Sequence, residues 1–153
     1  MLNRTHIAFS LFFGLILFYF VEEPLFFFVA LILGTLLPDL DSFNSKIGKR
    51  FFSRVLVAFT KHRGVMHSLF FMFLIYFVLH FYLPLFSLGF LVGYSSHLIG
   101  DLITKQGLRL FYPFKTRFHG FMKVGGRIES FLFFIFVVLD FILVFRVVIE
   151  SIF

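Results

Sequence analysis

The chain has 153 residues, of which 60% are hydrophobic and 14% are charged. Soluble domains are about 45–50% apolar and about 25% charged, so the composition excludes an ordinary soluble protein and predicts a membrane protein. The formal net charge of +6 could suit nucleic acid, but no aromatic-basic RNA motif or recognition-helix pattern is present. We therefore expect no nucleic acid, and the bilayer and a phosphorylated or lipid substrate as partners.

Five apolar stretches are expected to form helices. They are Ile7–Val21, Leu25–Leu37, Leu69–Leu83, Leu85–Ile99 and Phe131–Val148. Only the last approaches the roughly 20 residues of a full span, and the second would cover only about 20 Å of a core about 30 Å thick. Either flanking polar residues continue these helices into the interface, which we favour, or some segments enter without crossing.

The predicted fold is all-α, a polytopic membrane bundle in one domain, residues 1–153, with about five transmembrane helices. Thirteen of the fourteen Lys and Arg residues precede the first stretch or lie in the long connections after the second and fourth. The positive-inside rule makes this side cytoplasmic, which predicts a multi-pass inner-membrane protein with its N-terminus inside. Within the first long connection, Phe51–Phe59 has the pattern of a short amphipathic helix on the cytoplasmic surface.

Metal-binding residue types lie at one end of each apolar stretch. The candidates are His6, Asp39, Asp41, His62, His67, His97, Asp101 and Glu129. If successive stretches alternate in direction, all eight reach one membrane face. Because the chain has no Cys, a metal must use imidazole and carboxylate ligands. Eight groups exceed the three protein ligands of a catalytic zinc, so we expect one or two divalent ions. Softness alone does not separate zinc, manganese and iron, of which we favour zinc.

The local spacings support convergence, although each has a structural alternative. His97 and Asp101 are four residues apart and share a helix face, as would an ordinary pair near a helix end. Pro38 ends the second helix and places Asp39 in a turn, where the helix dipole disfavours negative charge and a cation would compensate. Glu129, by contrast, precedes the last stretch and would suit a helix N-terminus without any metal.

Other roles are assigned to catalysis and to substrate binding. Asp101 or Glu129 could act as general base, with His97 also in the catalytic group. Arg109 and Lys105 are candidates to hold a substrate phosphate, although orientation charge or lipid headgroup contact is the simpler explanation for most of the basic residues. His80 and Asp140 lie inside predicted spans and are expected to pair with each other.

These landmarks, in order, resemble those of the YdjM-like family of inner-membrane proteins, described as membrane-bound, metal-dependent hydrolases. The matching segments are NRTHIAFS, GTLLPDLDSFNSKIGKR, KHRGVMHSLF, VGYSSHLIGDLITKQGLRLFYPF and VGGRIESF. The resemblance implies that the same eight residues carry the site. Ser42 stands where relatives often have His, and Met66 stands where Thr is usual. Some members are described as binding a repressor of the DNA-damage response, which adds a regulatory protein partner to the expectations.

Three functions remain open at this point. The first is a metal-dependent hydrolase of phosphoesters in a lipid or membrane-proximal substrate. The second is a metal-free phosphatase of the lipid-phosphatase type, in which His97 is the nucleophile and Asp101 orients it. The third is a non-catalytic membrane regulator or a carrier of metal ions, in which His80 and Asp140 would belong to a translocation path.

Overall fold

The computed structural model of the protein describes residues 1–39 and 65–152. Its regular structure is helical. The α-helices are α1 (Asn3–Ile16), α2 (Pro24–Leu36), α4 (Leu69–Tyr82), α5 (Pro84–Ile103) and α6 (Arg127–Ile152), and two 3₁₀ turns are η1 (Phe18–Phe20) and η2 (Leu37–Asp39). The all-α prediction is confirmed for this part of the chain. The predicted amphipathic helix at Phe51–Phe59 lies outside the described residues.

Proline residues set several of these boundaries. Pro24 and Pro84 each occupy the first position of a helix, where a missing N–H costs nothing. Pro38 has the opposite effect, because α2 ends two residues before it and the chain tightens into η2. Asp39 therefore lies at the end of a turn, as predicted from the sequence.

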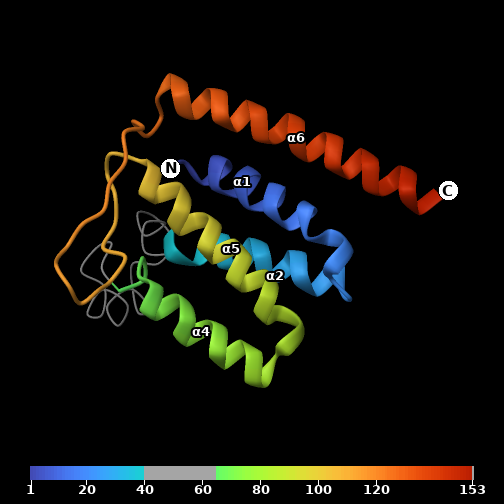
Figure 1. The fold of residues 1–153 in the computed structure, drawn as a ribbon, viewed down its shortest axis with the longest axis horizontal. Coiled ribbons are helices and arrows are strands. Elements are labelled where there is room, and N and C mark those ends of the chain that lie inside the picture. The colour runs from blue at the N-terminus through green and yellow to red at the C-terminus, as the bar shows by residue number, and fades with distance from the viewer. Residues whose placement is uncertain (40–64, 153) are drawn as a thin grey trace, which may run out of the picture.

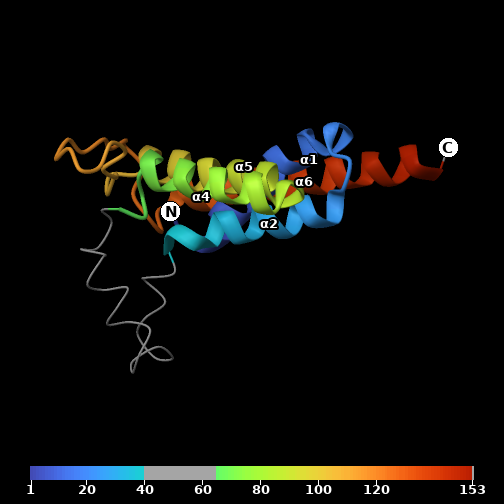
Figure 2. The same ribbon diagram turned by 90° about the horizontal axis from the view of Figure 1, so that it is seen from below.

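The helices lie in a row with one crossing pair in the middle (Figures 1 and 2). Helix α6 forms one edge, α1 comes next, α2 and α5 cross at the centre, and α4 forms the other edge. One end of the bundle contains the N-terminus, the end of α2, the start of α4, the end of α5 and the start of α6. This common end, called the site end below, brings together residues that are distant in the sequence.

Glycines hold α2 and α5 at very short distance. A Cβ atom added to Gly93 would lie 2.0 Å from the carbonyl oxygen of Leu31, and one added to Gly89 would lie 2.1 Å from that of Phe27. From the other side, a Cβ on Gly34 would meet the carbonyl oxygen of Phe90 at 2.5 Å. Small residues that allow backbones to touch are typical of helix pairs in membranes. This contact fixes the register between the end of α2 and the polar end of α5.

Two of the described helices are long and apolar enough to cross a bilayer, α5 with 20 residues and α6 with 26. Helices α1, α2 and α4 have 14, 13 and 14 residues, which makes each about 20 Å long. The prediction of about five transmembrane helices is thus supported for two of the described helices and stays a prediction for the other three.

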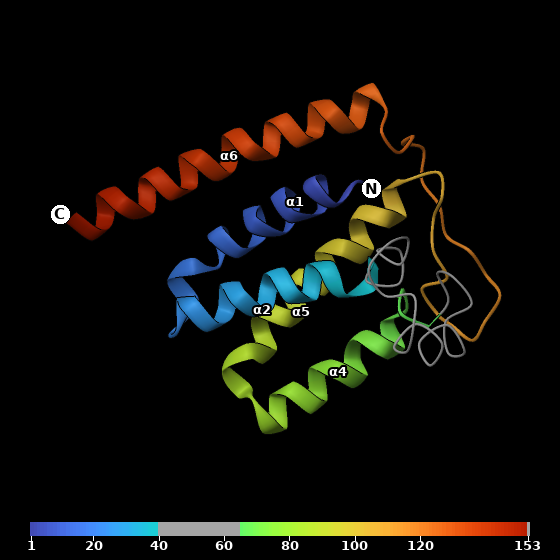
Figure 3. The ribbon, with the colours of Figure 1, turned by 180° about the vertical axis from the view of Figure 1, so that it is seen from behind.

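The predicted pairing of His80 with Asp140 is not found. His80 lies on α4 and Asp140 on α6, the two helices at opposite edges of the row (Figure 3). His80 is exposed and stacks on Tyr76 with ring centroids 5.7 Å apart. The sequence could place both residues within spans but could not show which helices are neighbours.

Candidate metal centre

Five of the eight predicted ligands meet at the site end of the bundle. His6 comes from the first turn of α1, Asp39 from η2, His67 from the turn before α4, and His97 and Asp101 from the last turns of α5. We call these five residues the His/Asp cluster. Asp41 and His62, the two further ligands predicted from the sequence, lie outside the described residues. The structure thus brings these five predicted ligands together, and their role as ligands stays a prediction.

Asp101 is the centre of the cluster and is buried, with a relative exposure of 3%. Its Oδ1 atom lies 3.3 Å from His6 Nε2 and accepts a hydrogen bond from the amino group of Met1. Its Oδ2 atom lies 3.8 Å from His67 Nε2 and 4.0 Å from His97 Nε2. One carboxylate oxygen therefore faces the amino-terminal segment and the other faces two imidazoles.

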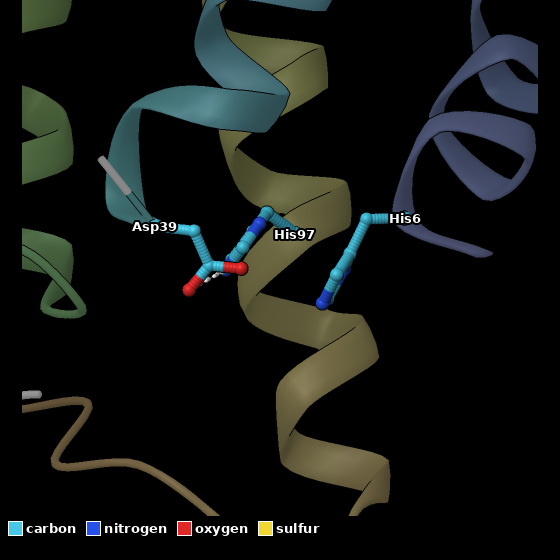
Figure 4. Close-up of side chains that lie close together, drawn as sticks. All are labelled: His6, Asp39 and His97. Carbon is cyan, nitrogen blue, oxygen red and sulfur yellow. Dashed lines mark ion pairs between the residues drawn. The ribbon is translucent and has the colours of Figure 1, made fainter. Parts of the chain in front are cut away.

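Asp39 approaches the same two imidazoles from η2. Its Oδ1 atom lies 3.5 Å from His67 Nε2 and 4.0 Å from His97 Nε2. Figure 4 shows the carboxylate of Asp39 directed at His97, with His6 on the other side of that ring. The side chain of Asp39 is 15% exposed, against 1–4% for the other four. Water would reach the cluster most readily along this carboxylate.

The imidazoles are packed against one another. The rings of His6 and His97 are stacked, with centroids 3.9 Å apart and planes inclined by 10° (Figure 4). The ring of His67 meets that of His97 edge-on at 5.4 Å. Within the described part of the chain, both ring nitrogens of His6 and of His67, and Nε2 of His97, have no partner in hydrogen-bond geometry. Buried polar atoms are normally satisfied, so these nitrogens are suited to a ligand.

A backbone carbonyl determines which nitrogen of His97 is available. Its Nδ1 atom lies 2.8 Å from the carbonyl oxygen of Thr35, and since a carbonyl can only accept, Nδ1 carries the proton. In a neutral ring the lone pair is then on Nε2, which faces Asp39 and Asp101. A histidine that donates its other N–H to a backbone carbonyl is the usual arrangement around a protein-bound metal.

Glu129 is buried but bonds to backbone instead of facing the imidazoles. Its Oε1 atom accepts from the backbone N–H of Leu2 at 2.6 Å, and its Oε2 atom accepts from that of Gly125 at 2.6 Å. Glu129 therefore joins the start of α6 to the segment before α1, which carries His6 in its first turn. This geometry favours the helix-terminus reading that the sequence left open over a ligand role.

The two predicted phosphate-binding residues follow α5. Lys105 and Arg109 are both exposed and lie on the segment between α5 and α6. Among the described residues no hydrogen bond or ion pair joins either to the His/Asp cluster. Their assignment to a substrate phosphate stays a prediction.

Sequence reasoning missed the partners that come from the backbone. Thr35 contributes a main-chain oxygen, and Met1 and Leu2 contribute main-chain nitrogens. One signal was available for Thr35, because its carbonyl lies in the last turn of a helix that ends before Pro38, where carbonyls have no intrahelical partner. The sequence holds no comparable sign that Asp101 and Glu129 bind the amino-terminal segment.

The family described as YdjM inner membrane protein matches residues 1–151. The uncharacterized protein YvsG of Bacillus subtilis (strain 168) is 34% identical over 119 residues, covering 74% of this chain and 74% of that protein. The inner membrane protein YdjM of Escherichia coli (strain K12) is 32% identical over 113 residues, covering 66% of this chain and 58% of that protein. No solved structure matches.

Proposed function

Since the chain belongs to the family of YdjM inner membrane proteins, we propose that the His/Asp cluster is a metal centre within the inner membrane and that the protein is a metal-dependent hydrolase. The observation that carries this proposal is the set of buried imidazole nitrogens, without hydrogen-bond partners among the described residues, that face two carboxylates. Burying so many polar atoms without hydrogen bonds is costly, and a divalent cation would satisfy the nitrogens that face the two carboxylates.

The donor set suits one ion held by His67, His97, Asp39 and Asp101. The possible ligand atoms form two groups, and within each group all atoms lie within 4.8 Å of one another. The groups are His6–Asp39–His97 and His67–His97–Asp101, and His97 belongs to both. Because Nδ1 of His97 is engaged by Thr35, its Nε2 atom can serve only one ion at a time. Mixed nitrogen and oxygen ligands are compatible with zinc, which we favour, and with manganese or iron. A second ion would need further ligands, such as Asp41 or His62.

Bound there, a divalent ion would polarise a phosphoryl oxygen and lower the pKa of water. The residues of the chain would do the rest. His97, held by Thr35, presents Nε2 in a fixed direction. Asp101 and His6, with Oδ1 and Nε2 3.3 Å apart, can hold or move a proton, so Asp101 can be ligand or base. Glu129 then positions the amino-terminal segment instead of acting on substrate.

The substrate we propose is a phosphoester of a lipid or another molecule at the membrane surface, with Lys105 or Arg109 holding its phosphate. The site end carries Arg4 and the basic segment between α5 and α6. By the positive-inside rule, this end would face the cytoplasm in a multi-pass protein whose N-terminus is inside.

The geometry favours this reading over a phosphohistidine mechanism. In that mechanism Asp101 would orient His97 through one ring nitrogen while the other attacks phosphorus. Here the Nδ1 position is taken by Thr35, and Asp101 lies 4.0 Å from Nε2, the nitrogen that would have to attack. A trapped phosphohistidine on His97 would reverse this preference.

The test is elemental analysis of detergent-purified protein, combined with hydrolysis of bis(p-nitrophenyl) phosphate before and after chelation. The native protein should hold about one equivalent of metal, and chelation should abolish hydrolysis until one divalent metal is restored. His67→Ala should lose both metal and activity. His119→Ala, which removes an exposed imidazole outside the cluster, is the matched control and should lose neither.

Each outcome separates the candidate functions. Full metal content without hydrolysis of any phosphoester would support a metal-binding regulator or carrier instead of an enzyme. Hydrolysis that is indifferent to chelation would contradict the metal-dependent mechanism. Equal metal loss in the His67 and His119 variants would show that the bound metal is not held by the cluster.

A further inference from the structure

The segment between α5 and α6, residues 104–126, has an unusual composition. No acidic residue occurs between Asp101 and Glu129. Its exposed cations are Lys105, Arg109, Lys115, Arg117 and Lys123. Interleaved with them are exposed aromatic rings: Phe111 (51%), Phe114 (71%), Phe118 (40%) and Phe121 (72%). Apolar rings combined with positive charge and no negative charge are the composition of a surface that binds anionic membranes.

The exposure of these rings does not come from a lack of packing in the segment. Leu108 and Met122 are fully buried. Leu108 and Phe118 exchange two backbone hydrogen bonds of 2.9 and 3.0 Å, and the N–H of Lys105 donates to the carbonyl oxygen of Met122 at 2.9 Å. Buried side chains and backbone hydrogen bonds thus fix the conformation of the segment, and the four phenylalanine rings are exposed on an ordered backbone.

The segment projects beyond the site end of the bundle (Figures 1 and 2). It begins beside the His/Asp cluster, because the hydroxyl of Thr104 donates to the carbonyl oxygen of Asp101 at 2.8 Å. It also contacts α4, where the N–H of Leu69 donates to the carbonyl oxygen of Leu110 at 2.9 Å. Helix α5 is about 30 Å long, the thickness of a hydrocarbon core. If α5 crosses the bilayer, as its length and composition allow, the segment that follows it would lie at the level of the lipid headgroups.

We infer that this segment is a binding surface for anionic phospholipid, with Phe114 and Phe121 inserted among the acyl chains and Lys115 and Arg117 bound to lipid phosphates. Phenylalanine gains free energy by leaving water, and Lys and Arg near a membrane surface are attracted to anionic headgroups. The inference goes beyond the proposed hydrolase, because it rests on other residues and holds whether or not the cluster is catalytic.

Because the native chain has no Trp, one introduced Trp reports on one position. We would make Phe114→Trp and Phe121→Trp separately, reconstitute each in vesicles of phosphatidylcholine and phosphatidylglycerol, and measure fluorescence quenching with one or the other lipid brominated. Both reporters should be quenched, with a binding constant for phosphatidylglycerol at least about fivefold that for phosphatidylcholine, since each Lys or Arg contributes about that factor. The preference should fall toward one in high salt.

Two comparisons test the charges specifically. In the Phe114→Trp background, Lys115→Gln with Arg117→Gln should lower the preference by about fivefold or more while leaving quenching itself in place. Phe20→Trp, at the opposite end of the bundle and close to Glu22 and Glu23, replaces a ring that is 80% exposed and should show no preference for phosphatidylglycerol. Reporters at 114 and 121 that neither lipid quenches would place the segment in water and overturn the inference. Equal quenching by both lipids, or a preference that the double substitution leaves unchanged, would also overturn it.

Discussion

Helices α5 and α6 both satisfy the requirements of a membrane span, yet they occupy opposite environments. In the most apolar window of α5, 56% of the residues are buried by the protein, against none in that of α6. Helix α5 contacts α1, α2 and α4, whereas α6 packs mainly against α1 within the described part of the chain. The more hydrophobic helix is the peripheral one, as is expected of a helix that faces lipid instead of protein.

The contrast shows where a membrane protein can place polar chemistry. Helix α5 carries His97, Asp101 and the glycines that admit α2, and neighbouring helices cover all of them. Its hydropathy is lower for that reason. Helix α6 has its buried acid, Glu129, in its first turn, where the helix dipole and two backbone N–H groups stabilise it. Ionisable groups in a membrane are tolerated where protein encloses them.

The largest difference between the helices should come from adding one methyl group to α5. Gly93→Ala places a Cβ within 2.0 Å of a backbone oxygen of α2, which neither helix can relieve by a side-chain rotation. We expect a loss of about 3 kcal/mol or more of stability, measured by unfolding in detergent followed by circular dichroism. Val138→Ala on α6, which shortens an exposed side chain, should change little. A Gly93→Ala variant as stable as the native protein would disprove the close contact.

The next difference concerns the two aspartates of these helices. Asp101→Asn keeps the shape of the side chain but removes the charge from the centre of the cluster. Its affinity for zinc should fall by more than the roughly 10–100-fold that loss of an outer-shell partner causes, measured by titration calorimetry. Asp140→Asn on α6 should bind zinc as the native protein does. If both variants bind zinc with native affinity, the cluster is not the metal site.

A smaller difference should separate the two ends of α6. In Glu129→Gln the new amide NH₂ group must face a backbone N–H, from Leu2 or Gly125, so one partly buried donor loses its acceptor. We expect a destabilisation of about 1–3 kcal/mol in the same unfolding measurement. Glu150→Gln is the comparison at the exposed far end of the helix, where the carboxylate bonds to Tyr19 and Arg146. It should cost less, because polar contacts between exposed groups contribute little to stability. Equal effects would show that Glu129 does not hold the amino-terminal segment.

The smallest test concerns helix starts. Ser68 caps α4, because its Oγ atom accepts from the N–H of Phe71 at 3.3 Å and donates to the carbonyl oxygen of Val65 at 2.6 Å. Ser68→Ala should cost about 1 kcal/mol of stability, as for other N-caps. Ser130, in the first turn of α6, bonds its hydroxyl to the carbonyl oxygen of Gly126 and is exposed, so Ser130→Ala should cost less. A larger loss for Ser130→Ala would contradict this assignment of the cap.

Much of the site could be predicted from the sequence because its residues occupy helix ends. Local stereochemistry explains why α2 ends before Pro38 and why His97 and Asp101 share a face of α5. Bundle topology then brings such ends together. The role of Glu129 could not be assigned in this way. Its position in the sequence does not reveal that its carboxylate accepts hydrogen bonds from the backbone N–H groups of Leu2, far away in the sequence, and of Gly125, close by. Nor could the supposed pairing of His80 with Asp140 be rejected, since helix order within the bundle is not encoded by hydropathy.

The sequence by itself determined that this chain lies in a membrane, that it is helical, and which polar residues stand at the ends of its apolar stretches, because burial and helix termination are local properties of side chains and proline. Only the tertiary structure decided that α2 and α5 touch through glycines, that Thr35 orients His97, and that Glu129 holds the amino-terminal segment. These depend on distances between segments remote in the chain, which are set by the packing of all the helices together.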